Sequence, residues 1–372
     1  MEKNGNDRYS RQIILKDFGP EAQQKLEVAR VLIIGAGGLG CPVLMYLTAA
    51  GVGTIGVADG DKVELNNLHR QILYDNNDIG LSKVQVASRK MKLKNPEVKI
   101  VTHDCFVSTA NVFDLLACYD LIVDATDNFS SRYMISDACH LMKKPLVYGA
   151  VSCYEGQVGV FNFNPNGIAS NYRDLFPVPP APGEANSCIT AGVLGVLPGL
   201  IGIMQANEVI KILTGVGIPL INKLFTIDIS DYRTLEIEVS PGVHSGMPGS
   251  VEEFMRFDYD SFCSVISTSD ELIAASTLKE WMLNEDWSII DVREKEEVKE
   301  NDLFSSVNVP LSTFKTEIEN VTLAENVIFV CASGVRSRLA LDIAKNIFPE
   351  RKLFSLSEGV QSLINLEFQK EN

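Results

Sequence analysis

Short apolar runs alternate with amphipathic segments along the first 150 residues of the chain. Strands are expected at residues 31–35, 54–59, 99–104 and 120–127, with helices at 42–51 and 83–95 between them. Continuous Val/Ile runs of this kind are typical of parallel strands buried on both faces. The pattern predicts an α/β fold with a Rossmann-like, mostly parallel sheet, which binds ligands at the carboxyl ends of its strands.

The middle of the chain departs from this alternation. A proline-rich stretch lies between residues 161 and 188, and the most apolar segment, 189–204, follows it and contains Pro198 and four glycines. This segment is shorter than the ~18 residues of a confident membrane span. It predicts a buried helix pair or an oligomer interface, followed by a helix at 206–215 and strands at 224–230 and 234–240.

A second α/β pattern begins near residue 262. Helices are expected at 277–284 and 337–348, and strands at 288–294, 326–333 and 352–357. The Pro/Gly-rich stretch 241–250 is typical of a linker. The sequence therefore predicts two α/β domains, at 1–245 and 262–372, joined by a linker at 246–261, and the second domain is the smaller.

Composition and charge narrow the classes of function. The 372 residues are 46% hydrophobic with a net charge of −15, which disfavours nucleic-acid binding through a broad basic surface. The polar N-terminus lacks the apolar core of a signal peptide. Eight cysteines include no C-x-x-C pair, so buried or reactive thiols are expected rather than disulfides. We expect a cytoplasmic protein that binds neither a membrane nor nucleic acid.

The first candidate site is a glycine-rich loop. Gly35, Gly37 and Gly40 fit G-x-G-x-x-G between a strand and a helix, which predicts a nucleotide phosphate at the helix N-terminus. Asp59, 24 residues after Gly35, suits the ribose of a dinucleotide or of ATP equally well. Two cations that follow, Arg70 and Lys83, favour a triphosphate, although surface cations on a helix would look the same.

Asp127 ends a predicted strand at the same edge of the sheet. Its carboxylate is a candidate ligand for Mg²⁺. The alternative is that it caps the helix that begins near Asn128, which is the more frequent role of a single aspartate at such a position.

Six motifs in order add a resemblance. The segments at residues 8–15, 35–41, 59–70, 80–83, 124–128 and 185–202 resemble the ThiF/MoeB/HesA family of ubiquitin-activating-like adenylyltransferases, over about residues 8–239. These enzymes activate small sulfur-carrier proteins for molybdopterin or thiamine thiazole synthesis. The resemblance implies ATP, Mg²⁺ on Asp127, a homodimer in which Arg11 reaches the partner's ATP, and a carrier whose Gly-Gly carboxylate attacks the α-phosphorus. The implied nucleotide site consists of Gly35, Gly37, Gly38, Gly40, Asp59, Asp61, Asn67, Arg70, Lys83, Asp127 and Asn128.

Two further expectations rest on the same resemblance. Cys188 stands where some family members bond transiently to the activated carrier, and a buried, inert cysteine is the alternative. Most relatives bind zinc through two C-x-x-C pairs, but Asn171, Asp174, Val243 and Gly246 occupy those positions here. Because a closed zinc site needs four Cys or His ligands, no zinc is expected.

The second α/β pattern resembles a rhodanese, a sulfur-transfer domain, through residues 288–294 and 329–338. Cys331 follows a strand and precedes a helix, Gly334 permits a tight loop, and Arg336 is expected to favour an anionic sulfur. Asp291 and Arg293 are expected to brace the loop. The alternative is a cysteine that merely ends a buried strand.

Together the two halves predict an adenylyltransferase with a sulfurtransferase domain. The first half makes a carrier acyl-adenylate, and a Cys331 persulfide, loaded by a donor such as a cysteine desulfurase, supplies sulfur for a thiocarboxylate. Two alternatives remain open: a related enzyme that adenylates a peptide or tRNA-linked carboxylate, and a non-catalytic partner that only binds a ubiquitin-like protein.

Overall fold

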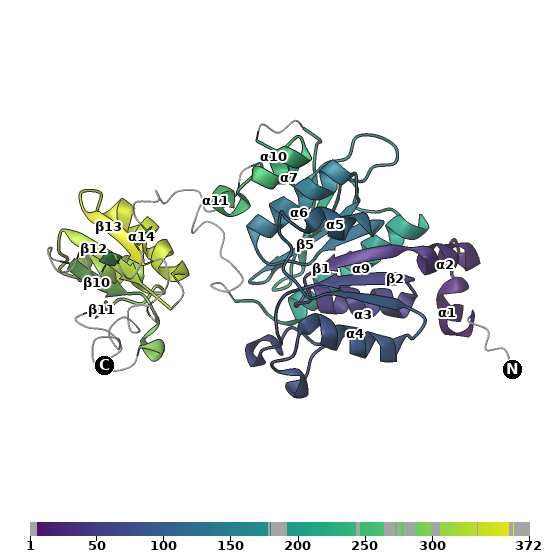
Figure 1. Ribbon diagram of the computed structural model, residues 1–372, viewed down its shortest axis with the longest axis horizontal. Coiled ribbons are helices and arrows are strands. Elements are labelled where there is room, and N and C mark those ends of the chain that lie inside the picture. The colour runs from purple at the N-terminus through teal and green to yellow at the C-terminus, as the bar shows by residue number, and fades with distance from the viewer. Residues whose placement is uncertain are drawn as a thin grey trace. The chain divides into compact units, whose positions relative to one another are not determined.

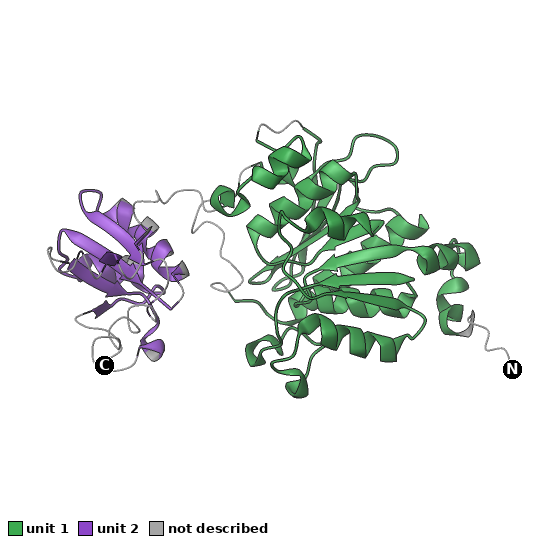
Figure 2. Cartoon of the chain, in the orientation of Figure 1, with its two compact units in different colours: residues 1–179, 186–263 green, residues 180–185, 264–372 purple. Residues whose placement is uncertain are grey.

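The computed structural model describes residues 6–177, 179, 192–242, 246–263, 272–273, 277–278, 281, 287–298, 306–332, 334–356 and 360. The chain divides into two compact units, coloured separately in Figure 2. The first contains residues 1–179 and 186–263, and the second contains 180–185 and 264–372. Each unit is described below by itself.

An eight-stranded sheet forms the centre of the first unit. Its strands lie in the order β3-β2-β1-β4-β5-β6-β7-β8, parallel from β3 to β5 and antiparallel from β5 to β8. The strands are β1 (Arg30–Ile34), β2 (Thr54–Ala58), β3 (Lys99–His103), β4 (Leu121–Asp124), β5 (Leu146–Ser152), β6 (Glu155–Phe161), β7 (Lys223–Asp228) and β8 (Arg233–Glu238). The predicted Rossmann-like, mostly parallel sheet is confirmed.

Helices cover both faces of this sheet (Figure 1). Val31 and Ile33 of β1 pack in the core on one face, and Leu32 and Ile34 pack in the core on the other. The first face carries α2 (Gly19–Val28), α3 (Gly40–Ala50), α4 (Lys83–Lys94) and α9 (Val196–Thr214). The second carries α5 (Val112–Ala117), α6 (Phe129–Met142), α10 (Val251–Arg256) and α11 (Tyr259–Cys263). The remaining elements are α1 (Asn6–Ile13), α7 (Tyr172–Leu175) and the 3-10 turns η1 (Leu65–Asn67) and η2 (Asn76–Asp78).

Helix α9 differs from the sequence-based expectation. A helix pair or an oligomer interface was expected at 189–204 and a separate helix at 206–215, but the described residues form one helix of 19 residues, Val196–Thr214. Pro198 lies in its first turn, where the missing N–H interrupts no helical hydrogen bond. Among the described helices α9 is long and apolar enough to cross a membrane, but Leu197, Ile201 and Val209 are fully buried in the core. We assign it as a core helix.

The segment expected to be a linker, residues 246–261, also differs. It contains α10 and the start of α11, which pack on α6 within the first unit. The side chain of Ser250 accepts a hydrogen bond from the N–H of Glu253 and caps α10. Phe254 and Tyr259 are buried. The two aromatic side chains fix the segment because they add apolar area to the core beneath it.

A parallel five-stranded sheet forms the second unit, in the order β11-β10-β12-β13-β9. The strands are β9 (Leu272–Ile273), β10 (Trp287–Asp291), β11 (Val307–Asn308), β12 (Asn326–Val330) and β13 (Lys352–Leu356). Helices α13 (Phe314–Glu317) and α14 (Val335–Ile347) accompany the turns η4 (Lys295–Glu297) and η5 (Ile318–Asn320). Most of the predicted helix at 277–284 lies outside the described residues. The smaller α/β unit is confirmed.

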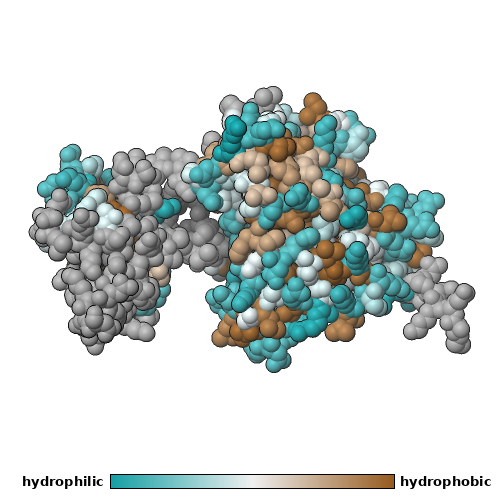
Figure 3. Space-filling model, viewed as in Figure 1, coloured by the Kyte–Doolittle hydropathy of each residue, from teal (hydrophilic) through white to brown (hydrophobic). Residues whose placement is uncertain are grey.

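The surface of the first unit mixes polar and apolar residues. Figure 3 shows hydrophobic residues scattered among hydrophilic ones on one of its faces. Val28, Leu93 and Ile218 are among the exposed apolar side chains. Such a mixture is usual for a surface in contact with water, since apolar atoms supply more than half of most protein surfaces.

Candidate active sites

The glycine loop joins β1 to α3 and lies against β4. A Cβ atom on Gly35, whose φ is +98°, would stand 2.6 Å from the carbonyl oxygen of Ala125, and one on Gly40 would stand 1.9 Å from that of Gly35. These two glycines let the backbone close on itself at the start of the helix. Gly37 and Gly38 line a cavity.

This cavity has a volume of about 550 Å³, within the range of small-molecule sites. It lies at the carboxyl ends of β1, β2 and β4, as expected for an open α/β sheet. The predicted nucleotide residues that line it are Gly35, Gly37, Gly38, Asp59, Asp61, Arg70, Lys83, Asp127 and Asn128. Residues far apart in sequence thus meet in one cavity.

The charged side chains of the cavity hold defined partners. The Asp59 carboxylate accepts hydrogen bonds from the N–H groups of Ala36, at 2.7 Å, and Asp61, at 2.8 Å. Lys83 is 5% exposed, and its Nζ lies 2.8 Å from an Asp61 carboxylate oxygen. The Arg70 guanidinium donates to the Asn66 carbonyl at 3.0 Å. The loop is therefore braced by one carboxylate, and the buried ammonium is neutralised by another.

Asp127 does not cap α6. The cap is Asn128, whose side-chain oxygen accepts the N–H of Ser131 at 2.9 Å. The exposed Asp127 carboxylate makes no hydrogen bond or ion pair within the described part of the chain, so it remains available to a ligand. The alternative of a capping aspartate is thereby replaced by a capping asparagine.

Three of the expected residues do not line the cavity, and a fourth cannot be placed. Gly40 packs under the loop, and Asn67 is buried beside Asn66, which lines the cavity in its place. Arg11 is exposed on α1. Cys188 lies outside the described residues.

The second candidate site is the loop between β12 and α14. Cys331, the first residue after β12, is fully buried, and Gly334 has a φ of +84° at the N-cap of α14. The Cys331 Sγ lies 3.5 Å from the Ser337 Oγ. The predicted arrangement of a cysteine between a strand and a helix N-terminus is present, with the sulfur packed inside the unit.

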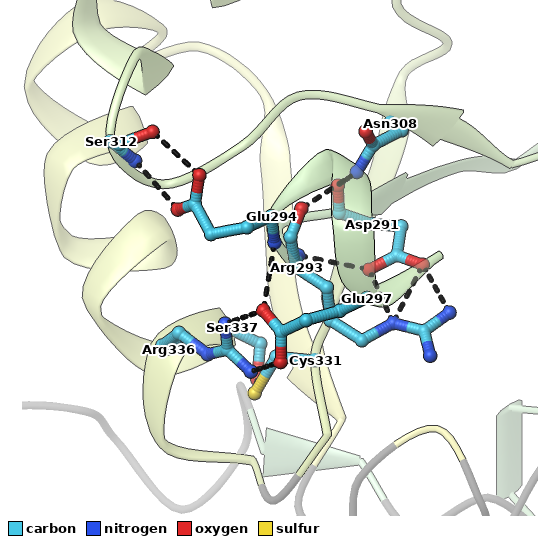
Figure 4. A network of polar contacts seen from close by, with 9 residues as sticks. All are labelled: Asp291, Arg293, Glu294, Glu297, Asn308, Ser312, Cys331, Arg336 and Ser337. Atoms are coloured by element: carbon cyan, nitrogen blue, oxygen red, sulfur yellow. Dashed lines mark hydrogen bonds and ion pairs between the residues drawn. The ribbon is translucent and has the colours of Figure 1, made fainter. Parts of the chain in front are cut away.

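Arg336 pairs with a carboxylate in addition to its electrostatic interaction with Cys331. Both of its terminal nitrogens donate to the carboxylate of Glu297, one at 2.8 Å (Figure 4). This contact lowers the pKa of Glu297 to about 2. The arginine charge is therefore shared with a carboxylate 39 residues earlier in the chain.

Asp291 and Arg293 brace the loop from the neighbouring strand. The Arg293 guanidinium donates to the Asp291 carboxylate at 2.7 to 3.1 Å, and both residues are buried. The side-chain amide of Asn308 donates to the carbonyls of both residues, at 2.9 and 2.8 Å. These bonds fix the end of β10 beside β12, the strand that directly precedes Cys331.

Comparison with known proteins assigns the chain to a protein family. A model described as the ThiF family matches residues 9–245, more than half of the chain. The chain belongs to the ThiF family. A rhodanese-like domain model matches residues 274–365 of the same ThiF-family chain. Both matches confirm the resemblances drawn from the motifs.

Named relatives and solved structures agree with this assignment. The chain is 37% identical over 350 residues to the probable adenylyltransferase/sulfurtransferase MoeZ of Mycobacterium tuberculosis, covering 91% of this chain and 88% of the relative. It is 44% identical over 264 residues to the sulfur carrier protein adenylyltransferase of Thermus thermophilus, covering 70% and 97%. The crystal structure of E. coli MccB matches with a TM-score of 0.58 at 21% identity, covering 67% of this chain and 74% of that one, and shows the fold alone.

Asn171 and Asp174 of this ThiF-family chain, which stand where relatives carry the first C-x-x-C pair, make hydrogen bonds. Asn171 caps α7, and the Asp174 carboxylate accepts the N–H groups of Asn171, at 2.7 Å, and Gly242, at 2.5 Å. Asp174 thus ties α7 to the residues just before the second pair. Val243 is outside the described residues.

Sequence reasoning missed several residues that shape the cavity at the glycine loop. Asn66, Gln71, Cys105, Phe106 and Ser131 also line it. Asp124 lies beneath it and accepts hydrogen bonds from the Thr126 N–H and hydroxyl, at 2.9 and 2.6 Å. Burial raises the pKa of Asp124. The repeated Asp in DATD was the available signal, because its first carboxylate orders the turn that carries the second.

Proposed function

We propose that this ThiF-family chain adenylates the C-terminal glycine of a small ubiquitin-like sulfur-carrier protein and then converts it to a thiocarboxylate. The observation that carries the proposal is the presence, in one chain, of a glycine-loop cavity with Lys83, Arg70 and Asp127 and of a Cys331 loop at a helix N-terminus. The names of the two relatives support both activities.

The cavity suits adenylation. A carboxylate oxygen of the carrier attacks the α-phosphorus of ATP, the bond to the bridging oxygen breaks, and pyrophosphate leaves. The attacking group is already ionised, so the reaction needs positioning and charge neutralisation more than a base. Lys83 and Arg70 supply cations, and Lys83 exchanges its Asp61 partner for phosphate oxygens.

Asp127 fits a magnesium ion. Its carboxylate faces the cavity without another partner in the described chain, and Mg²⁺ in phosphate sites takes one or two carboxylates together with substrate oxygens. The ion supplies neutralisation of phosphate charge when bound. Asp124, through Thr126, holds the turn on which Asp127 stands.

Sulfur transfer begins with a persulfide on Cys331. The Cys331 thiolate attacks the outer sulfur of a donor persulfide, such as that of a cysteine desulfurase, and the donor leaves as a thiolate. The outer sulfur of the new persulfide then attacks the acyl carbon of the adenylate, and AMP leaves. A thiolate, for which Cys188 is the candidate, attacks the Cys331 sulfur and releases the thiocarboxylate. A thiol reductant reopens the resulting disulfide.

The proposed assembly is a homodimer. Arg11 is exposed and makes no hydrogen bond or ion pair within the described part of its own chain, which suits a role at a partner's ATP. The compartment we propose is the cytoplasm, since the seven cysteines among the described residues are free thiols. Either a molybdopterin or a thiamine thiazole carrier satisfies the chemistry.

Exchange of pyrophosphate into ATP tests the first step. We expect exchange to require a carrier ending in Gly-Gly and to be lost when the terminal glycine is removed. Exchange driven equally well by another carboxylate, or none with any carrier, contradicts the proposal.

The Cys331→Ala variant tests the second step. It should keep exchange but form no thiocarboxylate with a persulfide donor present. Cys118→Ala, which removes an exposed thiol, is the control and should retain both activities. Thiocarboxylate formation by Cys331→Ala would exclude the relay.

A further inference from the structure

Two serine hydroxyls lie in line behind the sulfur of Cys331. The Cys331 Sγ is 3.5 Å from the Ser337 Oγ, which in turn lies 2.9 Å from the Ser355 Oγ. All three residues are fully buried, and they come from the end of β12, the first turn of α14 and β13. Figure 4 shows Ser337 beside the sulfur. No step assigned so far uses either hydroxyl.

The charged groups around the sulfur are already paired. Arg336 of α14 is held by Glu297 of η4, and the Asp291 and Arg293 side chains at the end of β10 form their own ion pair. Arg336 interacts electrostatically with Cys331, but both of its terminal nitrogens donate to Glu297, and no charged group is seen to donate a hydrogen bond to the sulfur among the described residues. An anion removed from water depends on hydrogen-bond donors, and donors to a charged acceptor are the strong ones.

The Ser337 hydroxyl can change partners as the sulfur ionises. With a neutral thiol, S–H donates to the Ser337 Oγ, and the Ser337 hydroxyl donates to the Gly334 carbonyl at 3.0 Å. When the thiol proton leaves for solvent, that hydroxyl can turn to the thiolate. The Gly334 carbonyl is at an N-cap, where it also accepts the first bond of the helix, so it keeps a partner. The Ser355 hydroxyl donates to the Ser337 Oγ and holds it in place.

We propose that Ser337 is a catalytic residue that donates a hydrogen bond to the Cys331 thiolate, and that Ser355 is its positioning residue. The inference rests on the proposed function, since it concerns the sulfur that would carry the persulfide. It adds a hydrogen bond from a neutral hydroxyl to the electrostatic attraction that Arg336 exerts on that sulfur.

The ultraviolet absorbance of the thiolate across a range of pH measures the ionisation of this buried sulfur without requiring access of a reagent. The full chain is used, and the same chain carrying Cys331→Ala is subtracted. Loss of a hydrogen bond to a charged group should move the midpoint of the titration profile of Ser337→Ala upward by about one to two pH units, or about 10- to 100-fold in the ionisation constant. Ser337→Thr should restore the wild-type profile, and Ser355→Ala should shift it in the same direction by less.

Ser288→Ala is the matched control. Its Oγ accepts the N–H of Ala324 at 2.7 Å within the same unit but does not contact the sulfur, so its profile should match the wild type. An unshifted profile in Ser337→Ala, or in Ser355→Ala where the first variant does not fold, overturns the inference. The assay uses neither ATP nor a carrier. Thiocarboxylate formation by Cys331→Ala would thus refute the proposed function alone.

Discussion

Asp137 and Arg173 form a buried ion pair that is expected to hold helix α11 against α6 in the first unit. Arg173 donates to the Asp137 carboxylate through Nε at 2.9 Å and through a terminal nitrogen at 2.8 Å, and the side chains of Arg173 and Asp137 are 2% and 1% exposed. The Tyr259 hydroxyl of α11 donates to the same carboxylate at 2.8 Å. Phe262 lies under the guanidinium, 4.7 Å away. Asp137→Asn keeps the shape of the side chain but removes its charge.

The magnitude follows from burial. Removing one partner of a buried pair leaves the other charge uncompensated and costs about 3–5 kcal/mol of unfolding free energy. For a domain of the size of the first unit, 1 kcal/mol corresponds to about 2–4 °C, so the melting temperature should fall by about 6–20 °C. Asp231→Asn is the control, because its partner Arg233 is 77% exposed and such pairs contribute about 1 kcal/mol or less.

Circular dichroism and tryptophan fluorescence separate the two units. The chain has two tryptophans, Trp281 and Trp287, and both belong to the second unit. Asp137→Asn should lower the melting transition seen by circular dichroism and leave the fluorescence transition unchanged. A loss no larger than that of Asp231→Asn would refute the assignment of Asp137 as the anchor of α11.

Three further changes have definite expected outcomes. Lys83→Ala should slow ATP–pyrophosphate exchange by about 10²- to 10³-fold, because it removes a cavity cation that the proposed mechanism assigns to the phosphates, whereas Lys62→Ala, an exposed neighbour, should change it little. Gly40→Ala should abolish ATP binding in calorimetry, since the new Cβ would stand 1.9 Å from a backbone oxygen. Gly37→Ala should weaken ATP binding less, because its Cβ would stand 3.6 Å from the nearest atom, a side-chain amide nitrogen. Glu297, whose pKa falls to about 2 when folded against 4.5 otherwise, stabilises the second unit above pH ~4.5 and loses that contribution as the pH falls toward 2. Fluorescence-monitored denaturation should therefore depend less on acid pH in Glu297→Gln than in the wild type.

The sequence predicted those parts of the fold in which one local pattern decides the outcome. The run Val31 to Ile34 is buried on both faces of the sheet, and an uninterrupted apolar run signals that directly. Helix α9 was divided wrongly, since a helix pair or an oligomer interface was expected at 189–204 and a separate helix at 206–215. Packing of α9 against α3, β5 and β6 favours one continuous element instead.

The candidate sites divide in the same way. Gly35, Asp59 and Lys83 were identified from motifs, and the fold brings them to one cavity. Contacts between residues distant in sequence could not be predicted from motifs. No sequence pattern around Arg336 indicates that Glu297, 39 residues earlier, is its partner. The expectation of a linker at 246–261 missed the contact of Tyr259 for a similar reason, because its partner Asp137 is 122 residues away.

The pairing of Arg336 with Glu297 bears on competition by small anions. Loops that close around phosphate or sulfate use an arginine fork with two free donors. Here both terminal nitrogens of that fork are committed to a carboxylate, so the loop has little net charge to attract an oxyanion. Inorganic phosphate and sulfate should therefore be poor inhibitors of persulfide transfer to Cys331. A donor protein can then approach the Cys331 sulfur without first displacing a bound anion.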